Sequence, residues 1–194
     1  MRATLVTILA AVLLIPACAS REELLPKSAV TPAGVDLSGT WQLRAENDDT
    51  LRRISEARRE AAGDGQGIVL PPKGTLSPTR RRSSDGTSVH VFLETGSTLK
   101  VSQTDYGLFI SFDRAVVEEY RFGEKRETNV GPIVADRVSG WDGNAYVIET
   151  LDQDGAKLIE IYRLNAADGS LVRTITIVHK GVSEVDVDQV FDRI

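Results

Sequence analysis

The sequence predicts an all-β domain, a single antiparallel up-and-down barrel of about eight to ten strands. From Ser88 onward, short apolar runs with a period of two are cut by turn residues, and no segment there has the length and amphipathic pattern of a helix. Asp142, Asp154 and Asp168 are each followed by glycine and separate the later runs, which favours hairpins because both residues tolerate positive φ. Closing such a meander into a barrel removes its unpaired edges.

Residues 1–17 predict a lipoprotein signal peptide. Arg2 precedes an apolar run that ends at Ile15, whereas a helix that spans a bilayer needs roughly 20 apolar residues. Ile15-Pro16-Ala17-Cys18 matches a lipobox, so we expect cleavage before Cys18, the only cysteine, and a lipid on its sulfur. With that thiol acylated, disulfide and thiol chemistry are excluded for the mature protein.

Residues 18–35 are expected to form a lipidated flexible tether. They contain Pro26, Pro32 and Gly34 and few large apolar side chains. Such a tether would hold the folded domain, expected over residues 36–194, away from the membrane.

The domain opens with a turn and a strand at Asp36–Leu43, on which Trp41 and Leu43 share one face. An insertion over residues 47–86 follows. Its first part repeats apolar residues at helical spacing as far as Gly63 and predicts a short helix on the surface. The rest is rich in glycine and proline and predicts a disordered basic loop.

Nine further strands are expected after the insertion, each an apolar run bounded by turn residues. They are Val89–Glu94, Thr98–Gln103, Leu108–Asp113, Val116–Phe122, Ile133–Trp141, Ala145–Leu151, Lys157–Leu164, Leu171–His179 and Glu184–Arg193. With the opening strand they make ten, and antiparallel pairing of sequential strands is the expected topology.

Positive charge is concentrated in the insertion. The chain has a formal charge of −5, yet Thr50–Arg82 holds eight Lys and Arg against three acidic residues, a local charge of +5 that leaves −10 elsewhere. The candidate contact residues are Arg52, Arg53, Arg58, Arg59, Arg80, Arg81 and Arg82. They favour contact with anionic lipid or an acidic envelope partner, the alternative being a solvated helix face and loop. Nucleic acid is not an expected partner, because no aromatic residues interleave the arginines.

Two short motifs resemble the lipocalin and calycin group. Gly39-Thr40-Trp41 stands on the first strand and Asp192-Arg193 on the last, and in that group an Arg of the final strand often stacks over the Trp of Gly-x-Trp. Residues 36–194 are also similar to uncharacterised bacterial secreted proteins that open with Ser-Gly-Thr-Trp, pass through a hairpin like Trp141-Asp142-Gly143 and end on aromatic-Asp-Arg. The resemblance implies a barrel with a cavity, closed through Gly39, Trp41 and Arg193.

No catalytic residue, cofactor or metal is predicted. His90 and His179 lack the further ligands or the nucleophile that a metal site or a catalytic base needs, and we expect both at strand ends. Glu149 and Glu160 could face the barrel interior as a glycosidase pair does, or an exposed outer face. Asp152-Gln153-Asp154-Gly155 has its glycine too early for a calcium loop and predicts a hairpin turn. Nucleophile-elbow, phosphate-loop and dinucleotide motifs are absent from the sequence.

These observations favour a bacterial lipoprotein on the periplasmic face of the outer membrane, since Ala19 rather than aspartate follows the lipidated cysteine. Two non-enzymatic functions fit. The barrel can enclose a cavity for one small apolar ligand. Alternatively, its own side chains fill it, and the basic insertion docks on a partner or an anionic membrane. The space inside the barrel distinguishes the two.

Overall fold

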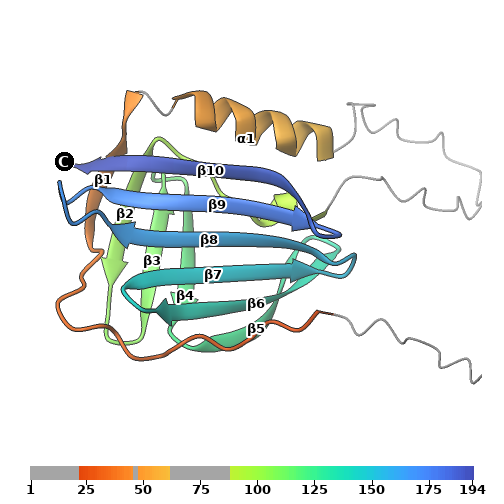
Figure 1. Ribbon diagram of the computed structural model, residues 1–194, viewed down its shortest axis with the longest axis horizontal. Coiled ribbons are helices and arrows are strands. Elements are labelled where there is room, and N and C mark those ends of the chain that lie inside the picture. The colour runs from red at the N-terminus through yellow and green to blue at the C-terminus, as the bar shows by residue number, and fades with distance from the viewer. Residues whose placement is uncertain (1–21, 46–47, 62–87) are drawn as a thin grey trace, which may run out of the picture.

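The computed structural model describes residues 22–45, 48–61 and 88–194, and it forms an antiparallel up-and-down barrel of ten strands (Figure 1). The strands are β1 (Gly39–Leu43), β2 (Thr98–Gln103), β3 (Gly107–Phe112), β4 (Val116–Arg121), β5 (Glu124–Val130), β6 (Ile133–Asp142), β7 (Ala145–Asp152), β8 (Ala156–Leu164), β9 (Leu171–His179) and β10 (Val182–Arg193). They pair in the order β4-β3-β2-β1-β10-β9-β8-β7-β6-β5, so the first strand joins the last. The predicted fold class is confirmed.

Side chains close the wall between β4 and β5, which lie at the two ends of the strand order. The Ser139 hydroxyl of β6 donates to the Arg121 carbonyl of β4 at 2.7 Å, and the Arg126 guanidinium of β5 donates to the Glu119 carbonyl at 3.0 Å. Two carbonyls of the β4 edge therefore have partners without a neighbouring strand. The barrel is nearly closed, and we call this junction the β4–β5 seam.

One expected strand is helical, and one strand was not expected. The strand expected at Val89–Glu94 is wrong: Ser88–Phe92 is a 3₁₀ helix, η2, whose Val89 and Phe92 are three residues apart and both buried in the core. β5 escapes prediction because its sequence, Glu-Lys-Arg-Glu-Thr-Asn-Val, has no apolar alternation. Arg126 of β5 lies opposite the buried Arg137, so this strand presents polar side chains to a polar part of the interior.

The interior is apolar towards both ends of the barrel. One buried cluster contains Trp41 of β1 and Phe191 of β10. A second cluster contains Ile54 together with Val89 and Phe92 of η2. Ile54 belongs to α1 (Asp48–Ala61), which lies along β10 in Figure 1, so this short helix contributes to the core. No helix in the described part of the chain combines the length and apolar character needed to cross a membrane.

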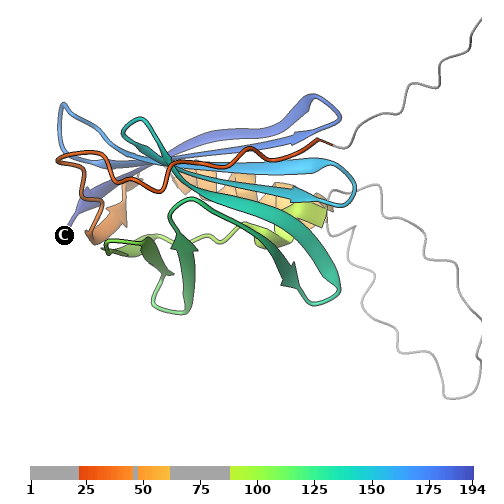
Figure 2. The same ribbon diagram turned by 90° about the horizontal axis from the view of Figure 1, so that it is seen from below.

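Residues 22–35 differ from the free tether expected there, because they run along the outside of the barrel wall (Figure 2). Leu24 is only 3% exposed and forms a buried cluster with Val138 of β6 and Leu151 of β7, on the outer side of the sheet. An exposed leucine pair in a tether would gain nothing from folding, whereas burial of Leu24 stabilises the wall by about 2 kcal/mol. We call residues 22–30 the N-terminal strap.

The strap is held by backbone contacts as well as by side chains. Ser28 and Trp141 of β6 exchange two backbone hydrogen bonds, of 3.0 and 2.8 Å, and Lys27 forms an ion pair of 2.6 Å with Glu149 of β7. Gly140 makes the close approach possible: it has a φ of +155°, and a Cβ there would stand 2.6 Å from the Ser28 carbonyl oxygen. The strap is therefore part of the folded domain.

Candidate functional site

A layer of polar side chains crosses the barrel between the two apolar clusters. It includes Glu160 of β8, Arg173 of β9 and Gln189 of β10, all buried. On each of these three strands, the residue two positions before or after the polar one belongs to the cluster of Trp41, and the residue two positions in the other direction belongs to the cluster of Ile54. The three side chains share the inward face, because side chains alternate along a strand. The layer therefore lies across the middle of the barrel.

Arg173 is the centre of this layer. Its guanidinium forms an ion pair with the Glu160 carboxylate, which accepts a hydrogen bond from Nε at 3.1 Å and a second from Nη2. Nη2 also donates to the Glu94 carbonyl at 2.8 Å, and Nη1 donates to Gln189 Oε1 at 3.3 Å. Burying a charge is costly unless it is paired and hydrogen-bonded, and both conditions are met here.

A second buried guanidinium, that of Arg137 on β6, lies beside the β4–β5 seam. Its Nε donates to the Thr150 hydroxyl at 3.0 Å, and Nη1 lies 3.4 Å from the Glu118 carboxylate of β4. The guanidinium carbon stands 5.5 Å from the centre of the Tyr120 ring and 5.7 Å from that of Phe92. Arg137 thereby connects β6, β4 and η2 through one positive charge.

Aromatic rings complete the packing around the two arginines. Arg173 lies over Phe112 at 5.1 Å and over Tyr162 at 5.5 Å, measured to the ring centres. The Tyr162 hydroxyl donates to the Glu160 carboxylate at 3.3 Å. Burial raises the pKa of Tyr120 and of Tyr162 well above the usual range of a phenol, so both side chains stay neutral.

The polar layer is electrically balanced and densely occupied. Arg173 is paired with Glu160 and Arg137 with Glu118, so each guanidinium that the structure describes in this layer already has a carboxylate. An anionic ligand at Arg173 would have to displace the Glu160 carboxylate, which is 1% exposed, and leave it buried without a counter-ion. At this level of the barrel the cavity implied by the family resemblance is filled by the chain's own side chains.

The two histidines converge on one carboxylate. His90 Nε2 of η2 and His179 Nδ1 of β9 each lie 3.5 Å from an oxygen of Glu184. This arrangement joins η2 to the end of the β9–β10 hairpin. Within residues 22–45, 48–61 and 88–194, no group of three or more His, Cys, Asp or Glu side chains could hold a metal ion.

The two carboxylates considered as a glycosidase pair lie on opposite faces of the wall. Glu160 points inward to Arg173, whereas Glu149 points outward and pairs with Lys27 of the strap. They cannot flank one glycosidic bond. Asp152 starts the β7–β8 turn, and its Oδ1 accepts from the backbone N–H of Asp154 and of Ala156, both at 2.9 Å. This carboxylate organises a hairpin turn, as expected.

The side chains expected to join the first strand to the last do meet. The Arg193 guanidinium lies over the Trp41 indole at 4.5 Å, and the two residues are direct partners in the β1–β10 ladder. Trp41 is fully buried, and its Nε1 donates to the Leu37 carbonyl at 3.1 Å. Gly39 stands beside them with a φ of +154°, which other residues rarely adopt, and a Cβ there would stand 3.2 Å from both side chains.

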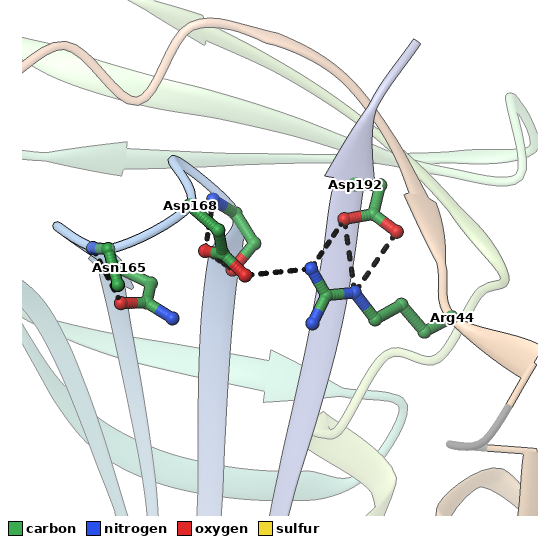
Figure 3. A network of polar contacts seen from close by, with 6 residues as sticks. Arg44, Asn165, Asp168 and Asp192 are labelled. Atoms are coloured by element: carbon green, nitrogen blue, oxygen red, sulfur yellow. Dashed lines mark hydrogen bonds and ion pairs between the residues drawn. The ribbon is translucent and has the colours of Figure 1, made fainter.

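A polar network that the sequence did not indicate lies next to this closure (Figure 3). Arg44, just after β1, forms a bidentate contact with Asp192 of β10 and donates to Asp168 of the β8–β9 turn at 2.9 Å. Hydrogen bonds from Ser170, and next from Arg44, lower the pKa of Asp168 to about 2. The three charged residues are far apart in sequence, so only the barrel closure brings them together.

The predicted basic contact is only partly described. Arg52 and Arg53 are exposed on α1, where Arg52 pairs with Asp49. Nothing is described of the side chains of Arg58 and Arg59, and Arg80–Arg82 lie outside the described residues, as does Cys18. The lipidation and the electrostatic contact therefore stay predictions.

A groove of about 520 Å³ lies on the outer face of the sheet from β1 to β4, and we call it the β1–β4 groove. Its lining residues are Thr40, Thr98, Lys100, Ser102, Phe109, Ser111, Arg114 and Val117. Phe109 is 38% exposed and Val117 64% exposed, and Tyr106 lies exposed in an adjoining hollow that Phe109 also lines. Large apolar side chains gathered on one exposed face are typical of an interaction surface.

Comparison with known proteins identifies no family for this chain. No protein-family model matches the sequence, and no curated protein matches it. A similar solved structure is the REP1-NXSQ fatty acid transporter, at 14% identity, with 82% of this chain and 96% of that chain covered and a TM-score of 0.46.

Two further structures are similar at the same level. One is a secretory abundant heat soluble protein from Ramazzottius varieornatus, at 14% identity, with 83% and 97% of the chains covered and a TM-score of 0.48. The other is a mutant of the fluorescent protein UnaG, at 16% identity, with 81% and 96% covered and a TM-score of 0.43. At these identities and TM-scores the three likenesses assign neither a family nor a function to this chain.

Proposed function

We propose that the protein is a non-enzymatic lipoprotein of the bacterial envelope, anchored through Cys18, whose filled barrel binds a protein partner at the β1–β4 groove. The observation that carries the proposal is the balanced polar layer. Because Glu160 and Arg173 occupy the middle of the barrel and neutralise each other, an internal ligand would have to replace a buried ion pair. The outer surface is then the part of the barrel available for binding.

The groove suggests the chemistry of the partner. Phe109 and Val117 offer exposed apolar surface, while Lys100 and Arg114 add two positive charges beside them. A protein segment that presents an apolar side chain flanked by carboxylates would cover Phe109 and Val117 with the apolar side chain. Its carboxylates would lie near Lys100 and Arg114. Burial of aromatic side chains supplies most of the affinity of such contacts, and complementary charge raises specificity and association rate.

The anchor is tested by the mass and location of the full-length protein. Export with cleavage before Cys18 and addition of acyl chains should place it in the membrane fraction, and Cys18→Ser should release a folded protein, because the lipid supplies the attachment. A Cys18→Ser protein that still sediments completely with membranes, with no mass difference from lost acylation, would show that the chain is not a lipoprotein.

The groove is tested by site-specific photocrosslinking in the envelope of the producing cell. A photoreactive phenylalanine analogue at Phe109 should give one discrete protein adduct, and the same analogue at Thr176, on the outward face of β9, serves as the matched control. The combined change Lys100→Glu and Arg114→Glu should weaken the adduct strongly, because it reverses the charge that would meet the partner. An adduct of equal intensity at both positions, or one indifferent to the charge reversal, contradicts the proposal.

A small amphiphile is the second candidate occupant. Its support is the volume of the groove, since pockets for small ligands have about 300 to 1,000 Å³. Native mass spectrometry of the chain lacking residues 1–18 distinguishes the two occupants. A co-purified mass that disappears with Phe109→Asp would favour the amphiphile, and a ligand-free mass would favour the protein partner.

A further inference from the structure

We infer that the barrel stands on the membrane with one particular end, built from the tips of the β5–β6, β7–β8 and β9–β10 hairpins, against the phospholipid headgroups. The inference rests on the anchoring through Cys18 proposed above and adds the orientation of the domain. We call this end the hairpin end; its tips are residues 129–132, 153–155 and 180–182. Figure 2 shows the three tips on the same side of the molecule.

The strand registers place the three tips together independently of the view. The β5–β6 turn lies beside the β7–β8 turn because Ala135 of β6 pairs with Asp152 of β7. The β7–β8 turn lies beside the β9–β10 turn because Ala156 of β8 pairs with His179 of β9. His179 in turn pairs with Val182 of β10. The β8–β9 turn and the C-terminus lie at the opposite end (Figure 1).

The contacts of the strap show at which end of the barrel it begins. Glu22 forms an ion pair with Lys157, which follows Ala156 at the start of β8, so the strap begins near the hairpin end. Six residues later Ser28 is bonded to Trp141, next to the β6–β7 turn at the opposite end. The strap therefore runs along the wall away from the hairpin end, and its start cannot swing to the other end without losing these contacts.

The chain between the lipid and the strap is too short to allow the opposite orientation. Four Cα–Cα steps separate Cys18 from Glu22, which span at most about 14 Å when fully extended. The nine residues of β9 alone extend over about 30 Å. A lipid on Cys18 can therefore bring the hairpin end to the membrane, while the β8–β9 turn stays beyond its reach.

The hairpin end presents exposed apolar side chains and a cation, beside the exposed carboxylate of Asp154. Val130 is 45% exposed and Val182 65% exposed, and Lys180 belongs to the same tip as Val182. Glu22 and Glu23, at the start of the strap, are paired with Lys157 and Lys125, which offsets their negative charge near this end. Exposed apolar residues and a cation near a surface with negative potential favour contact of the tips.

The test measures the distance of single sites from the headgroups. Acylation blocks Cys18, the only native cysteine, so a cysteine introduced into the full-length protein can be labelled alone with a fluorophore. Val130→Cys and Val182→Cys probe the hairpin end, Ala167→Cys the opposite end, and Val30→Cys the far end of the strap. Each purified lipoprotein is placed in phosphatidylcholine and phosphatidylglycerol vesicles with or without a headgroup nitroxide lipid, and its mass is recorded to verify acylation.

We expect quenching at Val130 and Val182 to be several times stronger than at Ala167 and Val30. Equal quenching at Val30 and Val182 would mean that the barrel lies on the strap, and stronger quenching at Ala167 would mean the reverse orientation; either result with an acylated protein overturns the inference and leaves the anchor intact. An unacylated protein that does not bind the vesicles would instead overturn the anchor and the orientation together.

Discussion

Replacing Arg173 with methionine should cost about 3 to 5 kcal/mol of unfolding free energy, the usual loss when one member of a buried ion pair is removed. The change keeps a long side chain and removes the donors that serve the Glu160 carboxylate, the Glu94 carbonyl and Gln189 Oε1. An acceptor left buried without a donor costs about 1 to 3 kcal/mol, more if it is charged, and Glu160 is only 1% exposed. Burial of the apolar methionine side chain offsets part of this loss of unfolding free energy.

The partner substitution supplies the decisive comparison. In the double variant Arg173→Met, Glu160→Leu, no buried charge lacks a counter-ion, so its stability should return to within about 1 to 2 kcal/mol of the original. Arg163→Met, at an exposed position of the same region, is the matched control and should change stability by less than about 0.5 kcal/mol. Urea unfolding of the chain lacking residues 1–18, followed by tryptophan fluorescence, measures all four proteins.

Two results would refute this reasoning. If Arg173→Met cost less than about 1 kcal/mol, the pair would have to be solvated, and the barrel would hold water or a ligand at its middle. If the double variant were as unstable as the single one, packing of the guanidinium against Phe112 and Tyr162 would be the main contribution.

Three further predictions concern the closure, the insertion and acid stability. Trp41→Ala should cost about 3 to 5 kcal/mol and Arg193→Ala about 0.5 to 2 kcal/mol by the same urea assay, and an Arg193→Ala cost as large as that of Trp41→Ala would contradict the stacking account. Replacing Arg80–Arg82 with glutamine should leave the melting temperature unchanged and weaken binding of the unlipidated chain to anionic vesicles, most at low salt; equal binding with and without the arginines would mean a solvated loop. Because the folded-state pKa of Asp168, about 2, lies below its ordinary 3.8, its ionised form stabilises the fold above pH 4, and this contribution should disappear as the pH falls from 4 to 2. The decrease in melting temperature between pH 4 and pH 2 should be smaller in Asp168→Asn than in the unchanged protein. An identical decrease in both proteins would exclude this carboxylate as its source.

The period-two alternation was sufficient to predict most of the barrel, and it failed where a strand is not half apolar. β2 and β9 have the predicted bounds. β5 carries charge on both faces because it borders the seam and the polar layer, so local apolar pattern gives no signal for it. Val89–Glu94 has the composition of a strand, and its helical turn is decided by the barrel end into which Val89 and Phe92 pack.

Part of the polar layer can be recognised in the sequence from the positions of its charged residues within two strands. Arg173 stands two residues from Leu171 and two from Ile175, and Glu160 likewise lies between Leu158 and Tyr162, so both are in register with inward-facing residues. That register predicts burial, and two buried opposite charges on adjacent strands predict a pair. The strap could not be found in the same way, because its packing depends on Gly140 more than 100 residues away.

The β4–β5 seam also bears on how the protein avoids polymerising. Sheet edges with free carbonyls can add a strand from another chain, which is how native β proteins begin to aggregate. Here the Glu119 and Arg121 carbonyls already accept hydrogen bonds from Arg126 and Ser139, and the edge strand β5 carries four consecutive charged side chains, Glu124–Glu127. A strand from a second molecule would have to displace these donors and bury charged side chains of β5. Strand pairing between two barrels at the β4–β5 seam is therefore disfavoured.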